Sequence, residues 1–141
     1  LDGRAIAAIP RAMYQSKGGE QIKGETLDDP QLVDLAARTI EGLGLVGPCT
    51  IQCFREHGEV LGITDINTRF GGGFPLPLAA GGDYPALILA MAAGEEVTPR
   101  LGEYRSGVVM TRFLSEHILV RDGDALIPMA PRDEEAVTGG I

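Results

Sequence analysis

The chain has 141 residues, of which 44% are apolar and 23% are charged, and this is the mix of an ordinary globular domain with a core of its own. Its formal net charge of −8, with lysines and arginines scattered singly, argues against a nucleic-acid-binding surface. No apolar run approaches the roughly 20 residues of a membrane span and no signal sequence opens the chain, so we expect neither a membrane partner nor export.

The first residues predict a strand followed by a loop. The chain begins at Leu1 with an Asp-Gly dipeptide, which indicates entry into a domain at a hairpin turn or, equally, a trimmed product. Residues 5–14 are small and apolar and read as a strand. Residues 16–26 are polar and glycine-rich, so we expect a mobile loop there, with a short strand near Gln21.

The first helix is predicted to begin at Pro30 and to end before Gly44. Asp28 and Asp29 are candidate N-cap carboxylates, and proline fits the first helical position because its missing N–H would have no partner there. Apolar residues then recur at helical spacing up to Leu43. A glycine directly after them is a natural C-terminal stop.

A β-hairpin is predicted next, from residues 48–54 and 59–67 joined by a turn at Gly58. Cys49 and Cys53 lie in its first strand, on one face but too far apart to form a disulfide. We therefore expect reduced thiols packed in the core and a cytoplasmic protein.

The register of this hairpin decides which side chains share a face. If the turn has two residues, Glu56 lies opposite Glu59 and Gln52 lies opposite Ile63. Gln52 then shares a face with Asp65 and leans toward it diagonally. A loop longer by one residue, without a compensating bulge, would place Gln52 on the other side.

The end of the second hairpin strand carries the residues with the most specific chemistry. Asp65, Asn67 and Arg69 are each two residues apart, so their side chains can project to the same side of a strand. A hard cation prefers oxygen ligands, and a phosphate prefers a fork of N–H donors. The sequence therefore predicts a Mg²⁺ seat beside an anion clamp, followed by residues 71–73, three glycines that let the backbone approach a ligand closely.

Each of these features also has a plainer reading. Asp65 and Asn67 are common turn-forming residues, and Arg69 could be a surface arginine. Residues 71–73 could be a flexible connector, and they are not a Walker-type loop because no Gly-Lys-Ser/Thr follows them.

The remaining elements are a helix and short strands. Asp83 and a nearby proline start a helix over residues 86–93 that Gly94 closes, and its apolar residues are expected in the core: Leu87, Ile88, Leu89 and Met91. Residues 107–119 read as a strand. Residues 118–127 read as a hairpin, and residues 128–141 read as irregular. Strands joined by short turns, with two main helices packed on them, predict a mostly antiparallel α+β fold.

With these elements placed, the chain resembles the C-terminal half of the ATP-grasp fold, above all that of the carbamoyl-phosphate synthase large subunit and related carboxylate–amine ligases. The likeness is most specific in residues 44–83 and covers most of residues 1–110. It rests on these segments: Gly44-Leu45-Val46-Gly47-Pro48, Ile51-Gln52-Cys53-Phe54, Thr64-Asp65-Ile66-Asn67-Thr68-Arg69-Phe70-Gly71-Gly72-Gly73, Ala80-Gly81-Gly82-Asp83 and Ala93-Gly94-Glu95. Ile9-Pro10-Arg11 and Lys17-Gly18-Gly19-Glu20 are similar but less specific.

The resemblance implies an enzyme that phosphorylates a carboxylate or bicarbonate with ATP and passes the acyl phosphate to ammonia or an amine. Gln52, Asp65 and Asn67 would hold Mg²⁺ or Mn²⁺, and Arg69 would stabilise the phosphoryl group in transfer. The similar segments around Arg11 and around Lys17 would contact the nucleotide phosphates. For these two residues a sheet-edge charge and a solvated loop lysine remain the alternatives.

Two departures from the family pattern and one absent part qualify the resemblance. The family usually has Glu at the position of Asp65 and Pro at the position of Thr68, so the bridging of two metals and the preorganisation of Arg69 are less secure. We expect residues 1–141 to form one domain, the C-terminal lobe, without the preceding lobe that grips the nucleotide. A truncated, non-catalytic remnant that serves as an interaction module is the alternative. The resemblance also allows two kinds of protein partner. One is an amidotransferase subunit that supplies ammonia, and the other is a second copy of the chain in a homo-oligomer.

Overall fold

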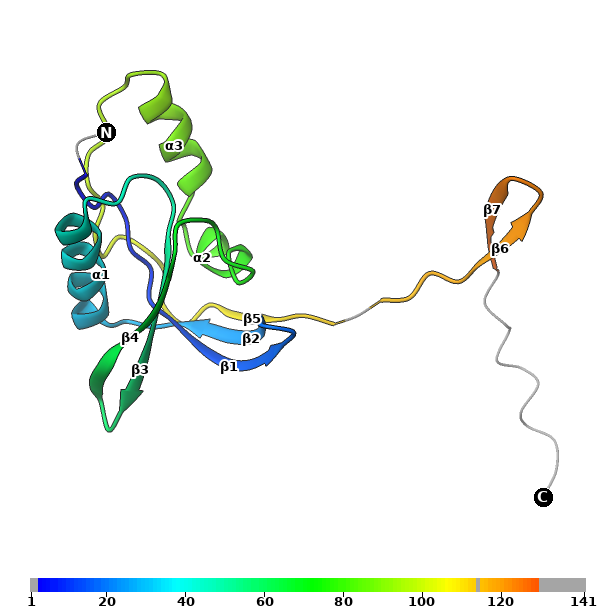
Figure 1. Cartoon of the computed structure of the whole chain (residues 1–141), viewed down its shortest axis with the longest axis horizontal. Coiled ribbons are helices and arrows are strands. Elements are labelled where there is room, and N and C mark those ends of the chain that lie inside the picture. Colours follow the sequence, from blue (N-terminus) through cyan, green and yellow to red (C-terminus); the bar gives the residue numbers. More distant parts are fainter. Residues whose placement is uncertain (1–2, 114, 130–141) are drawn as a thin grey trace.

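The computed structural model describes residues 3–113 and 115–129, and within them it has the α+β architecture that the sequence predicts. The elements follow in the order β1 (Arg11–Lys17), β2 (Glu20–Thr26), α1 (Pro30–Leu43), β3 (Thr50–Glu56), β4 (Glu59–Asn67), α2 (Pro75–Ala79), α3 (Tyr84–Ala92), β5 (Val109–Thr111), β6 (Leu119–Asp122) and β7 (Ala125–Pro128). All strand pairs are antiparallel and form three separate sheets, β1-β2-β5, β3-β4 and β6-β7. In Figure 1, α1 lies on one side of the β3–β4 hairpin, with α2 and α3 on the other.

The β1–β2 hairpin replaces the mobile loop expected over residues 16–26, so that part of the prediction was wrong, whereas the short strand expected near Gln21 is confirmed as β2. Gly18 and Gly19 form the turn with φ of 59° and 81°, and two consecutive left-handed residues are what a tight hairpin turn needs. The signal was the Gly-Gly dipeptide, which separates two polar segments that lack the apolar alternation of an ordinary strand. The strand predicted over residues 5–14 begins only at Arg11.

Helix α1 begins and ends where its sequence signals predict. The Asp29 carboxylate accepts a hydrogen bond from the backbone N–H of Leu32 at 3.1 Å. Gly44 adopts φ 62° at the C-terminus, where a residue with a Cβ would be strained. The nearly buried Asp29 also forms an ion pair with Arg55, which ties the start of α1 to the β3–β4 hairpin.

The β3–β4 hairpin has the predicted two-residue turn, with Glu56 opposite Glu59. Gln52, however, lies opposite Asp65 and not opposite Ile63, so that part of the predicted register was wrong. Two register shifts, one between Gln52 and Cys53 and one between Phe54 and Arg55, each add one residue to β4. One shift would turn Gln52 to the other face, whereas two shifts bring it back to the face of Asp65.

The second predicted helix is confirmed as α3, with the Asp83 carboxylate accepting the N–H of Ala86 at 3.1 Å. Its assignment to the core was wrong, because no residue of α3 is fully buried: Leu89 is 70% exposed, and Leu87, Ile88 and Met91 are half-buried. The short helix α2 was not predicted, and it contributes Leu76, which is 1% exposed. None of the described helices is both long and apolar enough to cross a bilayer.

Of the last predicted strands, the first is shorter than expected and the hairpin that follows it is present. Only Val109–Thr111 of the strand expected over residues 107–119 pairs, as β5 along β2. The predicted hairpin is present as β6 and β7 around Gly123, and Figure 1 shows it apart from the body of the fold. Of the segment predicted to be irregular, residues 130–141 lie outside the described part of the chain.

Candidate functional site

A cavity of about 810 Å³ with one polar and one apolar wall lies in the described part of the chain. Its apolar wall comes from facing sides of α1 and α3: Leu32, Leu35, Ala36, Ile40, Leu87, Ile88 and Met91. Its polar wall comes from β1, β2, the β3–β4 hairpin and the segment that follows this hairpin, and includes Arg11, Gln21, Thr50, Gln52, Asn67 and Arg69. A volume of this size with a few convergent polar groups is typical of a small-molecule site.

The structure brings Gln52, Asp65 and Asn67 to one face of the β3–β4 hairpin. Gln52 and Asp65 are paired directly across the strands, and Asn67 follows Asp65 on the same side. The amide nitrogen of Asn67 donates a hydrogen bond to one Asp65 carboxylate oxygen. The Asn67 amide oxygen and the second Asp65 oxygen accept no hydrogen bond from described residues, which leaves two oxygen ligands free for a cation.

This donor set suits Mg²⁺ only in company with phosphate oxygens. The residues offer one carboxylate and two amides, and nowhere in the described residues do three or more His, Cys, Asp or Glu side chains gather. Mg²⁺ keeps several waters and is usually held by one or two carboxylates together with substrate phosphates. The arrangement therefore fits a metal that arrives with a nucleotide better than a permanent structural ion.

Arg69 lies directly beyond this row, at the rim of the cavity. Its guanidinium donates to the carbonyl of Phe70 at 2.9 Å, and no carboxylate pairs with it among the described residues. Its own carbonyl accepts a bond from the Thr50 hydroxyl at 3.3 Å, which connects the end of β4 to β3. The guanidinium keeps most of its donors for a ligand.

The glycine loop, residues 71–73, packs tightly against the β1–β2 hairpin. A Cβ on Gly73 would lie 2.3 Å from Oε1 of Gln21, and a Cβ on Gly72 would lie 3.1 Å from Cγ of Glu20. Arg112 links the glycine loop to the β1–β2 hairpin, because its guanidinium donates hydrogen bonds to the carbonyl of Gly72 and to the carboxylate of Glu20. The loop therefore serves close packing and is not the open connector that the plainer reading suggested.

Of the two residues proposed to contact phosphates, Arg11 faces the cavity and Lys17 does not. Arg11 is half-buried in the polar wall, and its Nε donates to Oε1 of Gln21 at 3.0 Å. Burial lowers the pKa of the Arg11 guanidinium, and the nearby Tyr84 opposes this effect. Lys17 lies at the exposed tip of the β1–β2 hairpin and is not part of the cavity wall.

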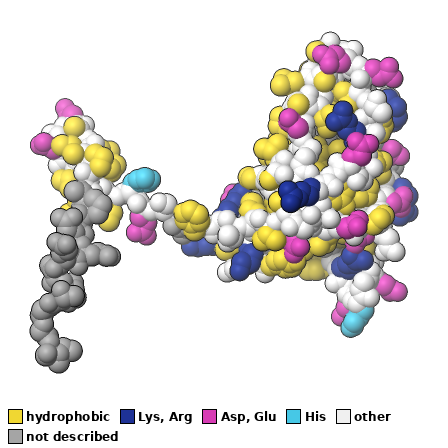
Figure 2. Space-filling model, turned by 180° about the vertical axis from the view of Figure 1, so that it is seen from behind, with side chains coloured by type: hydrophobic (Ala, Val, Ile, Leu, Met, Phe, Trp, Pro, Cys, Tyr) yellow, Lys and Arg dark blue, Asp and Glu magenta, His cyan; other side chains and the backbone are white. Residues whose placement is uncertain are grey.

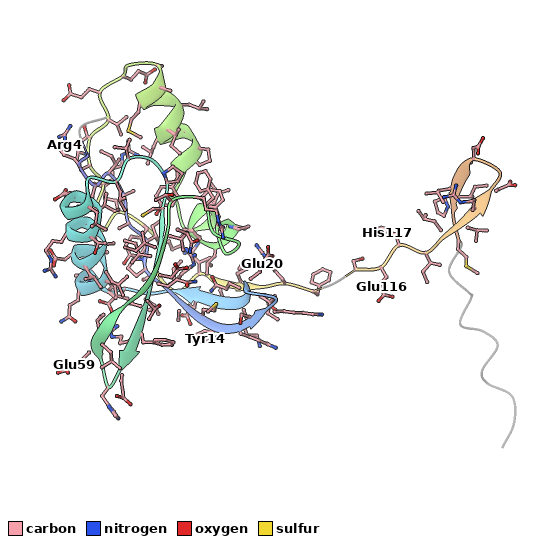
Figure 3. The ribbon with its side chains drawn as sticks, viewed as in Figure 1. Arg4, Tyr14, Glu20, Glu59, Glu116 and His117 are labelled. Carbon is pink, nitrogen blue, oxygen red and sulfur yellow. The ribbon has the colours of Figure 1, made fainter. Side chains whose placement is uncertain are left out.

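Side chains outside the cavity form no cluster of three or more metal-ligating residues in the described chain. Figure 3 shows Glu59 at the tip of the β3–β4 hairpin, and Glu116 and His117 on the segment that leads to β6. His57 shares the hairpin tip with Glu59, whereas His117 lies on the segment before β6, so the two histidines lie far apart. On the face seen in Figure 2, lysines and arginines lie singly among acidic side chains, without a basic stripe.

Tyr84 was not predicted as a site residue from the sequence, although it lines the cavity together with two phenylalanines that precede α2. Its ring centroid lies 6.1 Å from that of Phe74, which in turn lies 4.4 Å from Phe70. Burial raises the pKa of Tyr84 to about 12, with the Arg11 guanidinium acting in the opposite direction. A tyrosine directly after the predicted N-cap carries no sequence signal for such a contact.

The raised pKa of Tyr84 predicts a loss of stability in alkali. Between pH 10 and about 12 the tyrosine ionises in the unfolded chain but not in the folded protein, so its contribution is intact below pH 10 and is lost above it. Stability should fall by about 1.4 kcal/mol per pH unit in this range, and Tyr84→Phe should remove this part of the fall. Urea unfolding of both proteins at pH 9 to 12 measures it; identical slopes would contradict the prediction.

The comparison with known proteins found a match to one protein family. A family model described as "ATP-grasp in the biosynthetic pathway with Ter operon" matches residues 1–114. The match spans every element from β1 to β5 and all of the residues that line the cavity. No curated protein matches the chain.

Proposed function

The chain belongs to the ATP-grasp family, and we propose that it forms the metal-binding and phosphoryl-handling part of an ATP-dependent ligase. ATP-grasp proteins are in general ligases that use ATP with Mg²⁺. The observation that carries the proposal is the direct pairing of Gln52 with Asp65, with Asn67 on the same face and Arg69 next to them at the cavity rim.

In the proposed reaction, a carboxylate or bicarbonate oxygen attacks the γ-phosphorus of ATP. The bond between this phosphorus and the oxygen bridging it to the β-phosphate breaks, ADP leaves, and an acyl phosphate remains. An amine or ammonia then attacks the carbonyl carbon and phosphate leaves. The metal, when bound, would neutralise phosphate charge as a Lewis acid.

Each side chain of the row has a proposed part in this reaction. The oxygens of Gln52, Asp65 and Asn67 would hold the metal that accompanies ATP. The Arg69 guanidinium would bind the phosphoryl oxygens as charge builds up on them, with a fork that matches their geometry. Arg11 would add a second cation inside the cavity, whereas Lys17 could reach a phosphate only by a movement of the hairpin tip.

The apolar wall supports a proposal about domain organisation. Close-packed interiors do not keep voids of about 810 Å³, and the apolar faces of both helices border this one. Leu89 on α3 is 70% exposed besides. We propose that residues 1–141 act as one unit, the C-terminal lobe, and that a preceding lobe closes the cavity over the nucleotide.

The likeness to carbamoyl-phosphate synthase is the finer part of the proposal. It names bicarbonate or a small carboxylate as the acceptor and leaves room for an amidotransferase subunit. The description of the matching family model mentions a biosynthetic pathway, which agrees with a ligase that acts on a small metabolite. The acceptor is best identified by product analysis with bicarbonate and with amino acids.

Trapping of the acyl phosphate tests the proposal. Hydroxylamine converts acyl phosphates into hydroxamates, so the full-length protein with Mg-ATP, hydroxylamine and a panel of carboxylates should release ADP and hydroxamate in equal amounts. Omitting Mg²⁺ should abolish both products. Neither ADP nor hydroxamate with any acceptor would contradict the ligase and leave the non-catalytic remnant.

A further inference from the structure

Gln21 is the most deeply buried polar side chain beside the cavity, at 5% exposure, and it makes two hydrogen bonds there. Its amide nitrogen donates to the carbonyl of Ala12 at 2.9 Å, and its amide oxygen accepts from Nε of Arg11 at 3.0 Å. The first partner can only accept and the second can only donate, so the amide has one satisfactory orientation. Gln21 therefore fixes the position of Arg11 through the hydrogen bond to its Nε.

Two glycines make the slot in which this amide lies. A Cβ on Gly24 would lie 1.7 Å from the amide nitrogen of Gln21, and a Cβ on Gly73 would lie 2.3 Å from its amide oxygen. A side chain at either position would collide with the amide. Strand β2 and the glycine loop thus both depend on the same buried group, which couples the loop to the orientation of Arg11.

The Nη groups of the Arg11 guanidinium are left available for a ligand. Nε of Arg11 is taken by Gln21, and no carboxylate pairs with Arg11 among the described residues. Its Nη2 lies 3.4 Å from the place of a Cβ on Gly71, where the Thr50 hydroxyl lies at 2.8 Å. Since Thr50 pairs with Asn67, the free end of Arg11 lies beside the row of proposed metal ligands.

A half-buried cation without a counter-ion is costly unless a ligand supplies the opposite charge. The two Nη groups of an arginine fixed at Nε form the fork that binds two oxygens of a phosphate or a carboxylate. We propose that Gln21 is a positioning residue that preorganises Arg11 as an oxyanion-binding fork in the cavity. The identity of the anion, the γ-phosphate of ATP or the carboxylate of the acceptor, rests on the proposed function.

Gln21→Glu tests this with little change of shape. The new carboxylate would pair with Arg11 and occupy it, so the affinity for the oxyanion should fall by about 10- to 100-fold. Gln15→Glu is the matched control, because it adds the same charge to an exposed position of the same hairpin. Arg11→Lys keeps the charge, loses the fork, and should weaken the same ligand if Gln21→Glu does not fold.

Calorimetric titrations of the full-length proteins with Mg-ATP, Mg-ADP, inorganic phosphate and acetate provide the readouts. Weaker binding of Mg-ATP with unchanged Mg-ADP assigns the fork to the γ-phosphate. Weaker binding of acetate or phosphate with unchanged Mg-ATP assigns it to the acceptor. A structural role alone would weaken all ligands alike and lower the thermal midpoint, which would overturn the inference.

Two further outcomes would also overturn it: a wild type that binds none of the four probes, or a Gln21→Glu protein that binds all of them as the wild type does. Failure of the proposed function looks different. In that case the wild type forms no hydroxamate, yet Gln21→Glu still differs from Gln15→Glu in the binding of inorganic phosphate.

Discussion

Asn67→Ala should lower Mg-dependent ATP turnover of the full-length protein by about 1000-fold or more, because the loss of even an outer partner of a metal ligand costs 10- to 100-fold. Asn67 has two parts in the site. Its amide nitrogen donates to Asp65, and its amide oxygen is one of the free ligands of the row. Alanine removes both the ligand and the bond that orients the neighbouring carboxylate.

The fold should survive this substitution, since the Asp65 side chain that loses its partner is exposed and can be hydrated. The concentration of Mg²⁺ that gives half-maximal activity should rise together with the loss of turnover. Thr68→Ala is the matched control, because it alters the next residue, which is exposed and lies outside the row of proposed ligands. Turnover in Asn67→Ala equal to that of the wild type would remove the metal assignment.

The local signals in the sequence predicted those parts of the fold that one short segment determines. The start and the end of α1 follow from Asp29 and Gly44, which satisfy the ends of the helix through their own side chain or backbone. The β3–β4 turn follows in the same way from Gly58 and the alternation on either side. These features need no information from the rest of the chain.

The register of β3–β4 was predicted only in its first two pairs. Bulges depend on how a strand twists against its neighbours, and the period-two pattern contains no trace of an extra residue. Gln52 was nevertheless expected on the correct face, because an even number of shifts preserves the face. The predicted face of Gln52 was therefore correct only because there are two shifts, and the sequence does not show either of them.

The contacts that support the site could not be predicted from sequence motifs. Gln21 lies in a short strand that was predicted without a partner strand, and Arg11 is ten positions away, so their contact exists only once the hairpin has formed. Tyr84 lies on α3, and its electrostatic interaction with Arg11 joins two segments that are far apart in the sequence. The three glycines after Arg69 were read as room for a ligand, whereas the structure fills that room with Gln21, Glu20 and Thr50.

Gly24→Ala should be among the most destabilising single substitutions in the β1-β2-β5 sheet, at about 3 kcal/mol. Gly24 lies in the central strand and pairs with Met13 on one side and with Met110 on the other. A Cβ there would lie 2.4 Å from the carbonyl oxygen of Ala12 and still closer to the amide of Gln21. The amide could be expelled, but the carbonyl belongs to the neighbouring strand and cannot leave without breaking the ladder.

Combining Gly24→Ala with Gln21→Ala separates these two collisions. The double variant removes the clash with the amide and keeps the clash with the backbone, so stability should recover only in part. Gly62→Ala is the control, because Gly62 also lies within a strand and has open space where its Cβ would be; it should change stability by less than about 1 kcal/mol. Urea unfolding of the four proteins measures these differences. If Gly24→Ala unfolds at the same urea concentration as Gly62→Ala, then β2 does not lie against Ala12 as described, and the support of Arg11 by Gln21 is lost with it.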